Sequence, residues 1–146
     1  MKISAKNDII ANLEIGPGNG LFIKKYFENS SNVNVVAIDY SETMCEQVAK
    51  YNKKYIDEGL LDIKCENALE TSFDDETFDK VLTINTLHFW EPVEEQIKEL
   101  YRILKKGGQL ILGFSPKQIL EKLGCTKEKV PPSQKYLLME KQWILL

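Results

Sequence analysis

The sequence has few of the side chains that hold metals or form structural disulfides. Among its 146 residues are one histidine, His88, and three widely spaced cysteines, Cys45, Cys65 and Cys125, with no Cys-x-x-Cys pair. A zinc site needs several such ligands at close spacing, so we expect no metal. The odd number and wide spacing of the cysteines favour reduced, mostly buried thiols in a cytoplasmic protein.

Long apolar runs and an excess of positive charge are also absent. No stretch of about eighteen apolar residues is present, and the N-terminus lacks the apolar core of a signal peptide, so we expect no membrane span. A net charge of −3 argues against nucleic-acid binding. With 43% hydrophobic and 28% charged residues, the chain has an ordinary globular composition, and we expect residues 1–146 to form one domain.

The most informative stretch is residues 12–20, Asn-Leu-Glu-Ile-Gly-Pro-Gly-Asn-Gly. An apolar run at residues 9–15 predicts a buried strand, and residues 21–27 have a helical pattern. The glycines between them permit positive φ, and the helix start offers unpaired N–H groups. This turn suits a polar or anionic group of a nucleotide-like ligand, although a purely structural turn has the same pattern. Leu21 stands where the dinucleotide fingerprint has its last glycine, which disfavours a nicotinamide cofactor.

Two acids stand at the ends of predicted strands. Glu14 interrupts the first apolar strand near its carboxyl end, as either an acceptor near a cationic ligand or a buried acid paired with a lysine. Asp39 follows the apolar run at residues 33–38, about twenty residues beyond the glycine turn, where nucleotide folds place a ribose-binding carboxylate. Its alternative role is a second cap for the helix that Ser41 begins. Tyr40 and Met44 could flank an adenine ring, with core packing as the alternative for Met44.

The remaining pattern alternates strands with helices, which implies a parallel sheet with right-handed crossovers. Further strands are expected at residues 61–65, near the sheet edge, 78–84 and 109–114. One amphipathic helix should place Met44, Val48, Tyr51 and Tyr55 against the sheet and end at Gly59. A second should begin at Pro92, bury the stripe Val93, Ile97, Leu100, Tyr101 and Leu104, and end at residues 105–108.

The acidic segment at residues 74–76 reads as a solvated turn, and Phe73 beside it should point inward. Beyond a short helix expected at residues 117–123, two apolar runs at residues 136–139 and 143–146 leave a hairpin or a helix open. We expect this tail to pack in extended form beside the fifth strand, covering an otherwise bare edge.

Four motifs in order resemble the class I S-adenosylmethionine (SAM) methyltransferases of the small-molecule, ubiquinone-biosynthesis-like (type 11) group. They are the glycine turn at residues 13–20, the strand end at residues 37–41, the loop and strand at residues 73–81, and the helix and turn at residues 100–110. The resemblance covers about 70% of the chain and implies a Rossmann-like, doubly wound, mostly parallel α/β sheet. It implies the strand order 3-2-1-4-5, followed by an abbreviated C-terminal strand pair or edge segment.

The resemblance also implies SAM as cofactor, methyl transfer to a small-molecule acceptor, and a set of cofactor-binding residues. Asp39 would bind the ribose, Tyr40 would contact adenine, and Asn67 stands where the family usually has an aspartate for the adenine amino group. The full set is Glu14, Gly16, Pro17, Gly18, Asn19, Gly20, Asp39, Tyr40, Met44, Asn67, Ala68 and Asn85. His88, at the rim after the fourth strand, is a candidate base or a rim residue, and Phe89 and Trp90 either floor the acceptor pocket or pack on the next helix.

The chain departs from the family at both ends. Only about eight residues precede the first strand, where such enzymes usually carry helices, and the segment after the fifth strand is short. The alternative function is therefore a non-catalytic, SAM-binding or partner-dependent form of the fold. A homodimer or a partner subunit would then cover the shortened ends.

Overall fold

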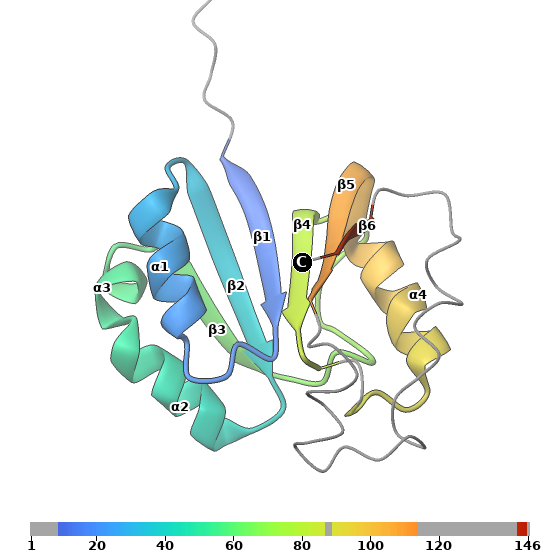
Figure 1. Cartoon of the computed structure of the whole chain (residues 1–146), viewed down its shortest axis with the longest axis horizontal. Helices are drawn as coiled ribbons and strands as arrows, with labels where there is room; N and C mark the ends of the chain where they lie inside the picture. Colours follow the sequence, from blue (N-terminus) through green and yellow to red (C-terminus); the bar gives the residue numbers. More distant parts are fainter. Residues whose placement is uncertain (1–8, 87–88, 114–142, 146) are drawn as a thin grey trace, which may run out of the picture.

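The computed structural model describes residues 9–86, 89–113 and 143–145 (Figure 1). The expected helix at residues 117–123, His88, Cys125 and the apolar run at residues 136–139 lie outside these ranges. The strands are β1 Ile10–Ile15, β2 Val33–Asp39, β3 Leu61–Cys65, β4 Phe78–Ile84, β5 Leu104–Gly113 and β6 Trp143–Leu145. The helices are α1 Leu21–Asn29, α2 Glu42–Tyr51, α3 Lys53–Asp57 and α4 Val93–Ile103.

The described strands form one parallel sheet in the order β3-β2-β1-β4-β5-β6. The predicted Rossmann-like order 3-2-1-4-5 is therefore confirmed, with β3 at one edge. At the other edge Trp143–Leu145 pairs in parallel with residues 110–112 of β5, so this part of the tail is extended beside the fifth strand, as predicted. Parallel order places the carboxyl ends of the strands at one side of the sheet, where ligands of such folds bind.

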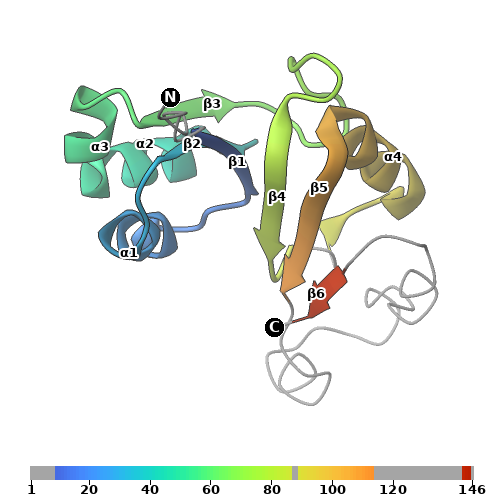
Figure 2. The ribbon, with the colours of Figure 1, turned by 90° about the horizontal axis from the view of Figure 1, so that it is seen from above.

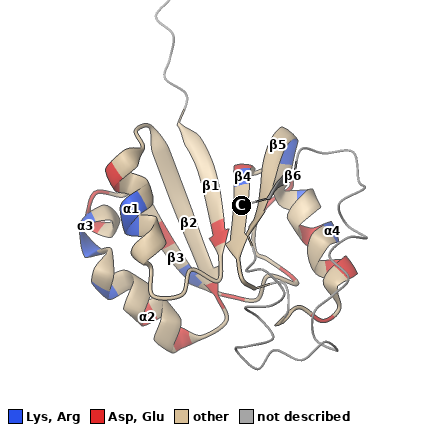
Figure 3. Ribbon diagram, in the orientation of Figure 1, with Lys and Arg blue, Asp and Glu red and all other residues tan. Residues whose placement is uncertain are grey.

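Helices cover both faces of the sheet, and each face has its own core (Figure 2). Leu13 and Ile15 of β1 pack with α4, whereas Ile23 and Phe27 of α1 pack with α2 and β2. Successive strand residues point to opposite faces, so Glu14, between Leu13 and Ile15, lies on the face of α1 and α2. Figure 3 shows a red, acidic segment at the carboxyl end of β1, in the middle of a largely uncharged sheet.

Two helices differ from their predicted extent. Tyr51 was expected to face the sheet but is 55% exposed, because α2 ends there and buried Asn52 takes the inward place. Tyr101, expected in the buried stripe of α4, is 59% exposed, and Gln96 is buried instead. The predicted end of this helix, at residues 105–108, is too late, because α4 ends at Ile103.

The reason for this early end is the pairing of β4 with β5. Leu104 pairs with Phe78, and the next pair is Gln109 with Lys80, so residues 105–108 form an irregular excursion within β5. Gly107, at φ +76°, makes the turn in that excursion. Lys105 reaches back to Asp79 on β4, with Nζ–Oδ1 at 3.0 Å, which holds the start of β5 against β4.

Removing residues 143–146 should destabilise the chain and promote self-association, because β5 then loses the strand that pairs with its edge. The lost strand pairing should lower the melting temperature by about 5 °C or more, from roughly 1 kcal/mol per hydrogen bond. Thermal melting and sedimentation measure both effects. Deletion of Leu146 alone, which spares β6, is the control; equal melting temperatures and a monomeric truncated chain would contradict the role given to β6.

Candidate functional site

The carboxyl ends of the central strands meet at one edge of the sheet. Ile15 of β1 pairs with Ile38 of β2 and with Thr83 of β4, so the three strands end at the same level. On the next strand, Asp39 pairs with Cys65, the last residue of β3. The segments that follow these ends carry most of the predicted site residues, and Figure 1 shows them on the same side of the sheet. The fold therefore brings together residues that are far apart in the sequence.

The glycine turn that follows β1 has a backbone that other residues adopt only with strain. Gly16, Gly18 and Gly20 have φ of +66°, +57° and +77°. A Cβ on Gly18 would meet nothing within 4 Å, so open space lies beside this backbone. The Asn19 side-chain oxygen accepts a hydrogen bond from Leu21 N at 3.1 Å, which caps the start of α1. Pro17 is buried, so the loop is anchored at its base and open at Gly18.

Gly20 is required for packing as well as for its turn. A Cβ there would lie 2.6 Å from Asn52 Nδ2 and 3.2 Å from Val48 Cα, so α2 leaves no room for a side chain. Asn52 is only 1% exposed and donates hydrogen bonds through Nδ2 to Gly20 O and Val48 O, both at 3.0 Å. Sequence reasoning missed Asn52, because it predicted one continuous helix ending at Gly59, whereas the helix is divided at Asn52 into α2 and α3.

Thr83 is a second residue that sequence reasoning missed. It is 1% exposed, and its hydroxyl donates to Ile15 O at 3.0 Å while contacting the Thr86 hydroxyl. Thr86 in turn lies against Gly16, where a Cβ would be 2.6 Å from Thr86 Cγ2. These contacts tie the loop after β4 to the base of the glycine turn. The only signal in the sequence was one polar residue in an otherwise apolar strand end.

Glu14 is the most unusual side chain of this edge. It is 7% exposed, and within the described residues its carboxylate has no hydrogen bond or ion pair. The predicted alternative, a buried acid paired with a lysine, therefore finds no such lysine in that part of the chain. Burial raises the pKa of Glu14 to about 7, because the charged form is poorly solvated there. A carboxylate in this state would gain from a nearby cation.

Asp39 is half-buried at the end of β2, and one of its oxygens is in use. Oδ1 accepts a hydrogen bond from Ser41 N at 2.9 Å, which supports the turn into α2. Ser41 is the N-cap residue of α2 but makes no side-chain capping bond, so the predicted serine cap is present in position only. Oδ2 has no partner within the described residues, and Tyr40 beside it is 83% exposed. Asp39 thus takes part in the helix start and keeps one oxygen for another donor.

The other predicted residues surround this edge. Asn67 is exposed, and its Oδ1 accepts from Leu69 N at 2.9 Å, which leaves the second lone pair of that oxygen. Ala68 is buried, and Met44 on α2 is half-buried. Asn85 follows β4 with φ +56°, a left-handed conformation that asparagine tolerates better than most residues.

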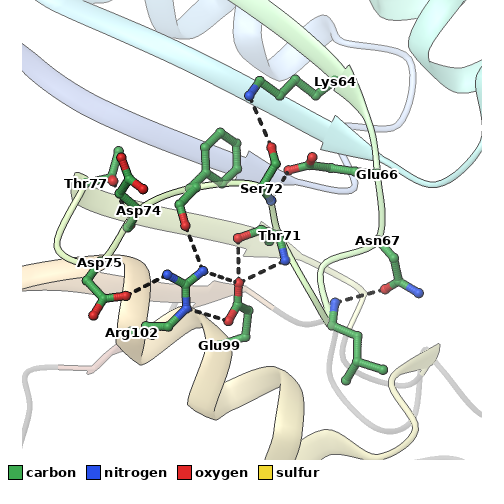
Figure 4. A network of polar contacts seen from close by, with 12 residues as sticks. Lys64, Glu66, Asn67, Thr71, Ser72, Asp74, Asp75, Thr77, Glu99 and Arg102 are labelled. Carbon is green, nitrogen blue, oxygen red and sulfur yellow. Dashed lines mark hydrogen bonds and ion pairs between the residues drawn. The ribbon is translucent and has the colours of Figure 1, made fainter.

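A salt-bridge network supports the loop that carries Asn67 (Figure 4). Glu99 of α4 accepts hydrogen bonds from Thr71 N and Oγ1, and it pairs with Arg102, with Nη2–Oε1 at 2.7 Å. Arg102 also bonds Asp75 and the Phe73 carbonyl. The guanidinium lowers the pKa of Glu99 to about 2. The acidic turn is thus bound to α4.

Among the described residues no group of acids, histidines or cysteines could hold a metal ion, and none of the helices has the length and apolar character of a membrane span.

Phe73 packs inward against Phe78 with ring centroids at 4.9 Å, as predicted. Trp90 is buried in the core beneath α4, so of its two predicted roles it has the packing role. Phe89 is 76% exposed. Cys65 is exposed, so the expectation of mostly buried cysteines is wrong for this residue.

Comparison with known proteins identifies the family. Residues 13–112 match the family described as "Methyltransferase domain", and the chain belongs to it. The chain is 30% identical to a phosphatidylethanolamine N-methyltransferase of Cereibacter sphaeroides over 68% of its own length and 48% of the relative's. It is 31% identical to 24-methylenesterol C-methyltransferase 2 of Arabidopsis thaliana over 68% of its length and 27% of that protein's.

A solved structure gives the same answer for the fold. PH0226 from Pyrococcus horikoshii OT3 superposes with a TM-score of 0.67 at 28% identity, over 82% of this chain and 56% of that one. The chain therefore spans about half, or less, of the length of these proteins. Its family is that of the SAM-dependent methyltransferases, as the sequence motifs predicted, and the cofactor of this family is S-adenosylmethionine.

The raised pKa of Glu14 predicts that its charge destabilises the folded chain. Its folded-state pKa, about 7, exceeds the ordinary glutamate value of 4.5, so its contribution to stability is full below pH 4.5 and lost as the pH rises through 7. The stability of Glu14→Gln relative to the native chain should therefore increase by roughly 3 kcal/mol between pH 4.5 and pH 8. Urea unfolding across this range measures the difference.

Glu99→Gln is the matched control, because the pKa of Glu99 is shifted in the opposite direction. Glu99 stays charged in folded and unfolded chains above about pH 5.5, so the difference between Glu99→Gln and the native chain should be constant from there to pH 8. A constant difference for Glu14→Gln over the same range would contradict the burial argument.

Proposed function

We propose that this chain binds SAM at the edge formed by the carboxyl ends of β1, β2 and β4 and transfers its methyl group to a small-molecule acceptor. The observation that carries the proposal is the Glu14 carboxylate, buried and unpaired within the described residues, beside a glycine turn with open space at Gly18. SAM carries an ammonium and a sulfonium, and a buried acid without a counterion fits such a ligand.

The remaining contacts of the proposed site follow from the positions of its residues. Glu14 and the turn from Gly16 through Pro17, Gly18 and Asn19 to Gly20 would hold the methionine part, with Asn85 near the sulfonium. Asp39 Oδ2, which has no partner among the described residues, would accept from a ribose hydroxyl. Tyr40, Met44, Asn67 and Ala68 would line the adenine, with the second lone pair of Asn67 Oδ1 facing its amino group.

SAM, when bound, supplies a methyl group that its sulfonium already activates. The chain then has to hold the cofactor in one orientation, align the acceptor and exclude water, and such orientation can contribute roughly 7–11 kcal/mol. Thr83 and Asn52 serve this purpose, because they fix the loop after β4 and the glycine turn to rigid elements. His88 is the proposed base for acceptors that must lose a proton.

The small-molecule acceptor is an inference from the resemblance to the type 11 group. The names of two relatives of similar identity indicate unlike acceptors, a phospholipid amine and a sterol carbon. The stretch shared with these relatives carries the proposed cofactor-binding residues. Acceptor specificity is then expected to depend on residues outside this shared stretch. We do not favour the non-catalytic alternative, because the family match covers the whole stretch from β1 into β5.

Asp39→Ala tests the cofactor site directly. Loss of a charged acceptor should weaken SAM binding at least about tenfold, from roughly 1.5–3 kcal/mol for one such hydrogen bond. Isothermal titration calorimetry measures the dissociation constant, and circular dichroism checks that the variant is folded. The matched control is Asp62→Ala, an exposed carboxylate within β3, which should bind SAM as the native chain does. An unchanged constant for Asp39→Ala would refute its ribose role.

Turnover is tested separately from binding. The chain is incubated with SAM and with acceptors that present an amine, a hydroxyl or an unsaturated carbon, and release of S-adenosylhomocysteine is measured. Product with at least one acceptor, lost in Asp39→Ala at low SAM concentration, supports the proposed enzyme. SAM binding with no turnover on any acceptor would favour the non-catalytic alternative.

A further inference from the structure

Two cysteines from separate elements meet directly beneath Asp39 and Tyr40. Cys45 lies in the first turns of α2, and Cys65 is the last residue of β3, where it pairs in register with Asp39. Cys45 Sγ lies 3.6 Å from Asp39 O, and Cys65 Sγ lies 3.6 Å from Tyr40 O. Both thiols therefore donate to consecutive carbonyl groups of the same turn.

Cys45 also lies close to the backbone of Cys65. Cys45 Sγ lies 3.9 Å from Lys64 O, which belongs to the peptide bond that joins Lys64 to Cys65. The neighbouring Cys65 thiol is also one of the causes that raise the pKa of Cys45. Cys65 is exposed and Cys45 is partly buried, so a reagent in solution reaches Cys65 first.

We propose that Cys45 and Cys65 form a reversible disulfide that lowers the affinity of the chain for SAM; the second half of this inference rests on the proposed function. The oxidant is a small disulfide, RSSR, such as oxidised glutathione. The Cys65 thiolate attacks one sulfur of RSSR, which forms a mixed disulfide and releases one RS⁻. Cys45, as thiolate, then attacks Cys65 Sγ and releases the second RS⁻. The two protons lost by the cysteines end on two molecules of RSH.

The local environment makes Cys45 the slower partner. Burial, and next the contact with Cys65, raise the pKa of Cys45 to about 11, so little thiolate is present near neutral pH. The first step removes the Cys65 thiol and with it one of these causes. The second step is also intramolecular, which raises its rate. Ring closure should therefore become faster as the pH rises.

The disulfide would act on the cofactor edge through the backbone. Its formation removes both S–H donors from Asp39 O and Tyr40 O, and it fastens the start of α2 to the end of β3. The carbonyl groups of Asp39 and Tyr40 thus lose the hydrogen bonds that hold them in place. These two residues are the ones proposed to bind ribose and adenine. By linkage, bound SAM should make disulfide formation less favourable at equilibrium.

The first measurement is the mass of the chain after treatment with oxidised glutathione. All samples carry Cys125→Ser, which removes the third thiol. The expected result is a mass lower by two hydrogen atoms, a peptide that links Cys45 to Cys65, and full reversal by dithiothreitol. Cys45→Ser should keep a glutathione adduct on Cys65, and Cys65→Ser should react much more slowly. A stable adduct on Cys65 with no cross-link in the parent would overturn the proposed disulfide.

The second measurement is a calorimetric titration of SAM with the reduced, oxidised and re-reduced chain. The oxidised chain should bind SAM at least about tenfold more weakly, which is the effect of losing one hydrogen bond between the ribose and the charged Asp39 carboxylate. Reduction should restore the affinity. Equal affinity of the oxidised and reduced chains would overturn the regulatory role. A reduced chain that binds no SAM would overturn the proposed function and this regulatory role together, while the mass measurement judges the disulfide alone.

Discussion

The burial of a single carboxylate at the end of β1 is the constraint around which the site is arranged. Glu14 lies between Leu13 and Ile15, whose side chains belong to the core beneath α4, and strand alternation turns it towards α1 and α2. Its pKa of about 7 records the unfavourable solvation of its charge. A fold under selection for stability alone would place a neutral residue there. The position makes physical sense for a chain that binds a cationic ligand at this edge.

The surrounding structure keeps the edge rigid, and none of the described residues pairs with the Glu14 carboxylate. Asn52 fixes the carbonyl of Gly20, and Thr83 fixes the carbonyl of Ile15, so both ends of the glycine turn are held by buried side chains. On the α4 side, Glu99 has the opposite environment, since Arg102 and Thr71 satisfy its charge and its pKa falls to about 2. Glu99 stabilises the loop that follows β3, whereas Glu14 has no such partner within the described residues.

Local patterns in the sequence predicted the strands, the glycine turn and the carboxyl-edge position of Asp39, because periodicity and glycine spacing depend on neighbouring residues. The strand order was predicted from the resemblance to the methyltransferase family. Features that depend on contacts between distant elements were missed. Asn52 matters because α2 packs on Gly20, and α4 ends at Ile103 because Leu104 pairs with Phe78. Likewise, nothing around Cys45 or Cys65 in the sequence indicates that they lie close together. The pairing of β2 with β3 sets Cys65 beside Asp39, and the start of α2 places Cys45 Sγ 3.6 Å from Asp39 O.

The central claim is that Glu14 is a buried acid whose charge a bound cation stabilises. The most direct test is the carboxyl pKa of Glu14 itself, measured from the ¹³C chemical shift of its side chain with and without saturating SAM. We predict a pKa of about 7 in the free chain and a fall of one unit or more when SAM is bound. An ordinary pKa in the free chain, or the same raised pKa with and without SAM, would contradict this account.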